Sequence, residues 1–208
     1  MRWLICLVLS AATASAESAL DRLVARSAPA IIGETGTWTT PTGTVLAADP
    51  LTLFGTENPI AGLPDTPATV LGFYPLDSPG RTGLMALIWS DDPVVCGEDV
   101  ATIGVDAGLA AFLAPSDLPV LESYMDEWGD LYAGPYAEQI DTSYPGPTLI
   151  DLPGASGFPL SGSGWGDGGY PVATLKDASG RVTALYAQFI TAEGADWLLP
   201  SPCVDSTS

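Results

Sequence analysis

Any chemistry in this chain has to come from carboxylates, hydroxyls and backbone groups, because its 208 residues include no histidine. Catalysis by Ser-His-Asp or Cys-His groups is therefore excluded, as are His-ligated zinc, copper and haem sites. The only lysine, Lys176, lies beside a predicted turn, which disfavours a Ser-Lys pair. Neither a Gly-x-Ser-x-Gly nucleophile motif nor a phosphate- or dinucleotide-binding glycine motif is present in the required context.

The segment with the most distinctive composition is the glycine-dense loop 161–170. Glycines allow a backbone to adopt positive φ and to approach another group closely. Asp167, between Gly166 and Gly168, offers the oxygen ligands that calcium prefers. The competing interpretation is a tight turn that leads into a strand from Tyr170, with Asp167 accepting backbone N–H groups.

The aromatic side chains raise the possibility of a sugar ligand. Trp165 lies in the glycine-dense loop and is the aromatic residue that we expect to stack on a ligand. Trp128 and Tyr132 instead continue the three- and four-residue spacing of Leu121 and Tyr124. That spacing predicts a single helical stripe, so Trp128 and Tyr132 are expected to face the core.

The first residues have the features of a secretory signal peptide. Arg2 supplies a positive charge, about ten apolar residues follow, and Ala14-Ser15-Ala16 is a small-residue cleavage site. The sequence predicts a signal peptide over residues 1–16 and one globular domain over residues 17–208. The mature protein is expected in the periplasm or outside the cell.

Cleavage at that site would leave two of the three cysteines, Cys96 and Cys203. An exported chain meets an oxidising compartment, so the pair is expected to form a disulfide; two free thiols are the alternative. The disulfide would tie the C-terminal tail to the middle of the domain.

The charge balance is strongly acidic, with 25 Asp and Glu residues against 6 Lys and Arg residues and a formal net charge of −19. Without a basic cluster, nucleic acid and anionic lipid are excluded as partners. No later stretch approaches eighteen consecutive apolar residues, so we expect no membrane insertion of the mature chain. The acidic residues either maintain solubility or bind divalent cations or cationic partners.

Hydrophobic patterning predicts an α+β fold, with a strand-rich antiparallel or mixed sheet and two or three short helices packed on it. Strands are expected over 37–40, 44–47, 68–76, 83–90, 148–152, 170–176 and 181–190. Helices are expected over 17–28, over 107–113 and from a cap at Ser116 or Asp117. The run 84–89 is apolar on both faces, which predicts a central strand covered on both sides.

Three motifs occur in a fixed order: Ala-Asp-Pro-Leu at 48–51, Val-Asp-Ala-Gly at 105–108 and Gly-Trp-Gly-Asp-Gly-Gly-Tyr-Pro at 164–171. Together they resemble the bacterial family called domain of unknown function 4241, and the third motif is the specific one. The resemblance covers about residues 35–190. It implies a strand-rich domain and no established activity. This chain has Gln188 where the family commonly has Asp.

Each motif contains one aspartate: Asp49, Asp106 or Asp167. The first hypothesis is that they converge on one cleft, where Asp106 and Asp167 could act as a catalytic pair or the carboxylates could hold calcium. The second is that Asp49 starts a turn, Asp106 caps a helix and Asp167 shapes the glycine loop. The first hypothesis gives the ligand-binding candidates Asp49, Asp106, Trp165, Gly166, Asp167, Gly168 and Tyr170.

These observations favour an exported, non-catalytic binding or interaction protein with a protein or glycan partner. One alternative is a carboxylate-based hydrolase acting on a carbohydrate or cell-envelope polymer. Another is a toxin-neutralising partner protein, whose acidic surface would face a basic target. No cofactor is predicted apart from calcium at Asp167.

Overall fold

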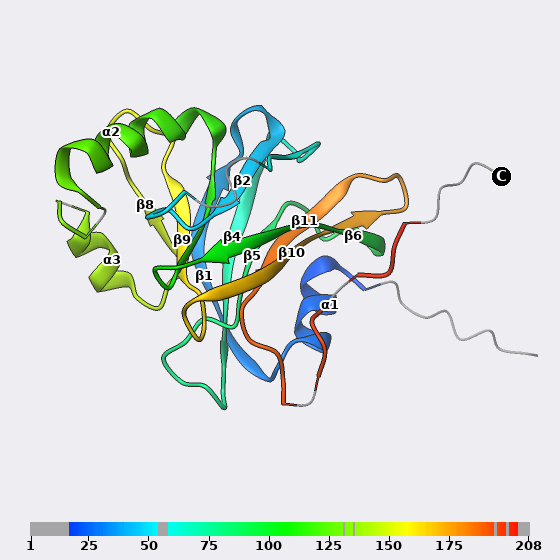
Figure 1. Ribbon diagram of the computed structural model, residues 1–208. Coiled ribbons are helices and arrows are strands. Elements are labelled where there is room, and N and C mark those ends of the chain that lie inside the picture. The colour runs from blue at the N-terminus through cyan, green and yellow to red at the C-terminus, as the bar shows by residue number, and fades with distance from the viewer. Residues whose placement is uncertain are drawn as a thin grey trace, which may run out of the picture.

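The computed structural model describes residues 17–53, 58–130, 132–134, 136–193, 195–198 and 200–203. It contains two antiparallel β-sheets with helices on their outer sides (Figure 1). The predicted signal peptide, residues 1–16, lies outside the described residues. Among the helices of the described ranges, none combines the length and apolar character needed to cross a lipid bilayer. The strand-rich α+β class is confirmed, but the expected one sheet is in fact two.

The larger sheet has six strands, and each neighbouring pair is antiparallel. Its order is β1 (Ala30–Thr39), β4 (Pro67–Pro75), β5 (Leu84–Ile88), β11 (Val182–Gln188), β10 (Gly168–Asp177) and β6 (Val94–Val105). All five residues of β5 are buried, which confirms the central strand predicted from the run 84–89. Strand β6 is not predicted from the sequence, because this edge strand is only partly buried and carries polar residues without a regular alternation.

The smaller sheet has five strands, in the order β3 (Ile60–Ala61), β2 (Thr44–Ala48), β7 (Leu109–Leu113), β9 (Phe158–Gly162) and β8 (Thr148–Ile150). The helix predicted over 107–113 is wrong, because Leu109–Leu113 is strand β7 between β2 and β9. All five of its residues are buried. A short run that is apolar on both faces has no periodicity to distinguish a strand from a buried helix.

The helices are α1 (Ala19–Arg26), α2 (Leu118–Trp128) and α3 (Ala137–Ser143), with single 3-10 turns at Pro41–Gly43 and Pro115–Asp117. α1 confirms the predicted N-terminal helix, and the Ser18 hydroxyl caps it by accepting from the N–H of Asp21. Asp117 precedes α2 but does not cap it. Its carboxylate instead accepts from the N–H and hydroxyl of Ser156, at 3.0 and 2.7 Å.

Both faces of each sheet are covered, which makes four layers (Figure 1). Met85, Leu87 and Phe112 lie in the apolar layer between the sheets. α1 places Leu23 on the outer face of the larger sheet, and α2 places Leu121 on the outer face of the smaller one. A strand that is buried on both faces has a nearly continuous apolar sequence, and this explains the composition of β5, β7 and β11.

The C-terminal tail is fastened to the edge of the larger sheet. Cys96 of β6 and Cys203 form a disulfide, which confirms the predicted pair. The N–H of Gly97 also donates to the carbonyl of Ser201 at 2.9 Å. A Cβ at position 97 would stand 2.2 Å from the carbonyl oxygen of Thr174 on β10 and 2.6 Å from the ring of Pro200, so glycine is required between the sheet and the tail.

Gln188 holds a second part of the tail from the buried end of β11. Its side-chain oxygen accepts from the N–H of Leu198 at 2.5 Å, and its side-chain nitrogen donates to the carbonyl of Ile190 at 3.2 Å. An ionised aspartate could accept but could not donate. The amide at position 188 therefore suits a local structural role, and the Tyr186 hydroxyl supports it by donating to the carbonyl of Leu198.

The turn from β10 to β11 is organised by the buried carboxylate of Asp177. It accepts from the N–H and hydroxyl of Ser179 at 2.8 and 2.6 Å and from the N–H of Arg181 at 3.0 Å. The hydrogen bond from the Ser179 hydroxyl is the largest cause that lowers the pKa of Asp177 to about 2, with Arg181 assisting against desolvation.

Because this folded-state pKa lies below the ordinary value of 3.8, the ionised Asp177 stabilises the fold fully above about pH 4. We expect that contribution to disappear as the pH falls through about 2. The stability difference between wild type and Asp177→Asn, from urea unfolding, should therefore shrink between pH 5 and pH 2. A difference that stays constant over this range would contradict the assignment.

Candidate functional site

Asp49 is fully buried and joins two distant segments of the chain. It follows β2, and its Oδ1 accepts from the N–H of Leu51 at 2.9 Å. Its Oδ2 accepts from the N–H groups of Asp106 and Ala107, both at 2.9 Å. A carboxylate that binds three backbone N–H groups and has no exposed surface is not available to a substrate or to water.

The three sequence motifs do meet. The Asp49 carboxylate binds the backbone of the second motif, and the second motif contacts the glycine-dense loop through backbone groups. The turn at Asp106–Gly108 lies against the loop between β9 and β10, where the N–H of Ser163 donates to the carbonyl of Gly108 at 3.0 Å. A Cβ placed on Gly108 would stand 3.9 Å from the Cα of Gly166. The helix cap predicted for Asp106 is wrong, because the residues that follow form strand β7. Asp106 and Asp167 are exposed, and their catalytic roles stay a prediction.

The glycine-dense loop is closed by hydrogen bonds of its own. The carbonyl of Gly166 accepts from the hydroxyl of Ser163 at 2.8 Å and from the hydroxyl of Tyr170 at 2.7 Å. Tyr170 is buried, which raises its pKa, and its ring packs edge-on against Phe189. The hydroxyl of Tyr170 thus serves the loop itself, in keeping with the tight-turn interpretation of residues 161–170.

Trp165 projects from this loop and is 63 % exposed. The guanidinium of Arg81 lies 4.1 Å from the centre of its ring and also donates to the carbonyl of Gly164 at 2.6 Å. The protein therefore already supplies a cation to one face of this indole. Stacking of a ligand on Trp165 stays a prediction and would be restricted to the other face.

Calcium binding was predicted at Asp167. Within the described ranges, no three Asp, Glu, Cys or His side chains are grouped closely enough to hold a metal ion. Calcium at Asp167 remains a prediction that a titration can test.

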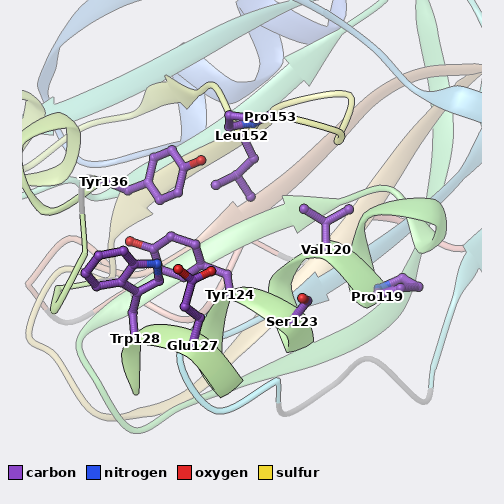
Figure 2. A pocket seen from close by; sticks show the side chains of 9 residues that line it. All are labelled: Pro119, Val120, Ser123, Tyr124, Glu127, Trp128, Tyr136, Leu152 and Pro153. Carbon is purple, nitrogen blue, oxygen red and sulfur yellow. The ribbon is translucent and has the colours of Figure 1, made fainter.

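A groove of about 490 Å³ runs along α2, on the outer side of the smaller sheet (Figure 2). We call it the α2 groove. Figure 2 shows the α2 side chains along one wall and the segments before α3 and after β8 along the other. The groove is lined by Pro119, Val120, Ser123, Tyr124, Glu127, Trp128, Tyr136, Leu152 and Pro153.

Three aromatic rings are packed together at one end of the α2 groove. The ring of Tyr124 lies 4.7 Å from that of Tyr136 and 6.4 Å from that of Trp128, measured between centroids. A Cβ on Gly134 would stand 1.7 Å from the Tyr124 hydroxyl, so glycine is needed where this loop covers the tyrosine. The rings of Tyr124 and Tyr136 are buried, and that of Tyr124 supports the Trp128 indole.

The core position expected for Trp128 and Tyr132 is wrong, since they are 44 % and 42 % exposed. Leu121 and Tyr124 of the same predicted stripe are buried. The reason is the end of the helix, because Gly129 adopts a φ of +92° and donates its N–H to the carbonyl of Met125 at the last turn. A glycine directly after a tryptophan that has acidic neighbours was the sequence signal for an exposed indole.

The helical layer around the α2 groove contains no basic residue. Between Arg81 and Lys176 the sequence has fourteen acidic residues and neither lysine nor arginine, and α2, α3, β7, β8 and β9 all fall in this interval. Glu127 is exposed in the groove, and within the described residues it makes no hydrogen bond or ion pair. The groove therefore carries an uncompensated negative charge.

Comparison of the chain with protein-family models, with curated protein sequences and with solved structures found no match. The resemblance to the domain of unknown function 4241 stays a prediction.

Proposed function

We propose that this protein is an exported, non-catalytic binding protein whose ligand site is the α2 groove. The observation that carries the proposal is the exposed indole of Trp128 in a groove of about 490 Å³, stacked on the buried ring of Tyr124, which in turn packs against Tyr136. Binding sites combine such apolar and aromatic walls with a few polar groups. An exposed tryptophan on a packed aromatic support has little freedom to lose when a ligand covers it.

The composition of the α2 groove favours binding over catalysis. Glu127 is the only carboxylate among its nine lining residues, and Ser123 is the only hydroxyl that is not phenolic. Glycoside hydrolysis by carboxylates uses a pair of them, and a serine nucleophile needs a base beside it. A single acid without a second titrating partner can attract and orient a ligand but lacks the second group for acid–base turnover.

Export is supported by the disulfide between Cys96 and Cys203, because such bonds persist in oxidising compartments. The positive charge of Arg2 and the small-residue site of the predicted signal peptide agree with export. The acidic surface would keep such a protein soluble outside the cytoplasm.

The test is thermal melting against a panel of cello- and chito-oligosaccharides, basic hexapeptides and acidic hexapeptides. A compound at a hundred times its dissociation constant stabilises the folded state by about 2.7 kcal/mol, which raises the melting temperature of a chain of this size by roughly 5–10 °C. We expect at least one class of compound to give such a shift. The shift should disappear in Trp128→Ala, which removes the exposed indole.

The matched control is Trp165→Ala, which removes a comparably exposed indole from a different part of the surface. It should retain the ligand-induced shift. If Trp165→Ala abolished the shift and Trp128→Ala did not, the site would be the glycine loop. No shift with any compound would also contradict the proposal.

A further inference from the structure

We infer that the α2 groove binds a basic, extended segment of a partner polypeptide, with a lysine or arginine side chain placed on the Trp128 indole beside Glu127. The inference rests on the binding function proposed above and adds the chemistry of the ligand. Three features of the groove carry it: its charge, its unoccupied aromatic face and its length.

The negative charge of the α2 groove favours a positively charged ligand. Glu127 is exposed there without an ion-pair partner among the described residues, and the surrounding layer has no lysine or arginine. The basic residues of the mature chain belong instead to α1, to the Arg81 segment and to the β10–β11 hairpin. A concave surface lined by one sign of charge concentrates counter-ions and speeds their association. An acidic ligand would meet only repulsion in this groove.

The aromatic face of Trp128 provides a binding position for that cation. Tryptophan is the best cation–π partner among side chains, and arginine or lysine within about 6 Å of its ring is attracted. Trp165 has such a partner in Arg81, at 4.1 Å from the ring centre. Within the described part of the chain, no corresponding guanidinium or ammonium lies over Trp128. A cation from another molecule can therefore occupy this position, with Glu127 as its counter-ion.

The length of the α2 groove favours a peptide over a small amine. Its α2 wall runs from Pro119 to Trp128, which at about 1.5 Å per residue is roughly 14 Å. An extended chain covers that distance with about four residues. Figure 2 shows Trp128 at one end of this wall and Val120 at the other, near Leu152. The expected ligand has a basic residue at one end and an apolar residue about three positions away.

The experiment uses dye-labelled hexapeptide mixtures with Lys, Arg, Gln or Glu fixed at one position, and measures their binding to the disulfide-bonded protein by fluorescence anisotropy. We expect the Lys and Arg mixtures to bind roughly tenfold more tightly than the Gln mixture, and the Glu mixture not to bind. Glu127→Gln and Trp128→Ala should each weaken binding of the basic mixtures roughly tenfold. Raising the salt from 0.1 to 0.5 M should weaken binding in wild type and much less in Glu127→Gln.

The matched control is Glu122→Gln, which removes one negative charge from an exposed position of the same helix outside the groove. It should bind like wild type. Equal weakening by Glu122→Gln and Glu127→Gln would overturn the inference, because attraction would then be diffuse. Tight competition by butylammonium or spermidine, at peptide-like affinity, would also overturn it by making a free amine the ligand.

The experiments distinguish a failure of the proposed binding function from a failure of the inference that its ligand is a basic peptide. If oligosaccharides or neutral peptides bind in a manner that depends on Trp128 while basic peptides do not, the binding function stands and the inference is wrong. If no compound depends on Trp128, both are wrong. Circular dichroism and melting of each variant exclude loss of the fold as the cause.

Discussion

Asp49→Ala is expected to lower the free energy of unfolding by roughly 3–5 kcal/mol. The carboxylate is fully buried and accepts three backbone N–H groups, from Leu51, Asp106 and Ala107. Alanine would leave these donors without a partner in a site closed to water. An unsatisfied buried donor costs about 1–3 kcal/mol, and more when its lost partner was charged.

Urea unfolding and hydrogen exchange measure this effect at two levels. The midpoint should fall in Asp49→Ala, and the amides of Asp106 and Ala107 should lose protection beyond the global change. The control is Asp106→Ala, which removes an exposed carboxylate but keeps its backbone N–H on Asp49. It should change stability by less than about 0.5 kcal/mol. Similar losses in both variants would show that Asp49 has no special role.

Removing the disulfide is expected to cost about 4 kcal/mol. Cys96 and Cys203 are separated by 107 positions, and closing so long a loop restricts the unfolded chain strongly. In the double variant Cys96→Ala/Cys203→Ala, the tail is held on β6 by weaker contacts such as the hydrogen bond from Gly97 to Ser201. The tail should then open by itself before the sheets unfold.

Urea unfolding with and without dithiothreitol tests whether the disulfide is the cause of the lost stability. Reduction should bring wild type to the stability of the double variant, and the double variant should not respond to the reductant. A wild type that is equally stable in both conditions would contradict the assignment. Binding in the α2 groove is an independent control, because α2 lies on the opposite side of the molecule from α1 and the tail (Figure 1).

The residues that stabilise the fold and the residues proposed to bind a ligand lie in different parts of the molecule. Asp49 and the disulfide act on the frame of two sheets, whereas Trp128 and Glu127 lie on its helical outer layer. Variants of Asp49 and of the disulfide should change the melting temperature without a ligand. Variants of Trp128 and Glu127 should change only the shift that a ligand causes. An acidic groove of this kind is the feature expected of a protein that captures a basic partner, including the toxin-neutralising alternative.

Local features of the chain could be predicted well where one residue type has one dominant physical role. Asp177 to Gly180 indicated a turn, and the residues on either side form the β10–β11 hairpin. The run 84–89 indicated a strand covered on both faces, and β5 is such a strand. The two cysteines that follow the predicted signal peptide indicated one disulfide, and Cys96 and Cys203 form it.

Prediction failed where the outcome depended on neighbours that are distant in sequence. The run 109–113 has no periodicity that distinguishes strand from helix, and pairing with β2 and β9 makes it a strand. Trp128 has the spacing of a core residue, yet the helix ends at the next position and leaves the indole over the groove. Edge strand β6 has a mixed polar pattern that only its pairing with β10 makes extended.

The sequence by itself determined which functional groups this protein has: no imidazole, an excess of carboxylates, three cysteines of which two follow the predicted signal peptide, and a stretch from 82 to 175 without lysine or arginine. These are properties of composition and need no neighbours. The tertiary structure alone decided that the Asp49 carboxylate is buried and hydrogen-bonded, whereas the Glu127 carboxylate is exposed in the α2 groove. Two of the three N–H groups that bind the Asp49 carboxylate come from residues 57 and 58 positions away, and no local pattern encodes such contacts.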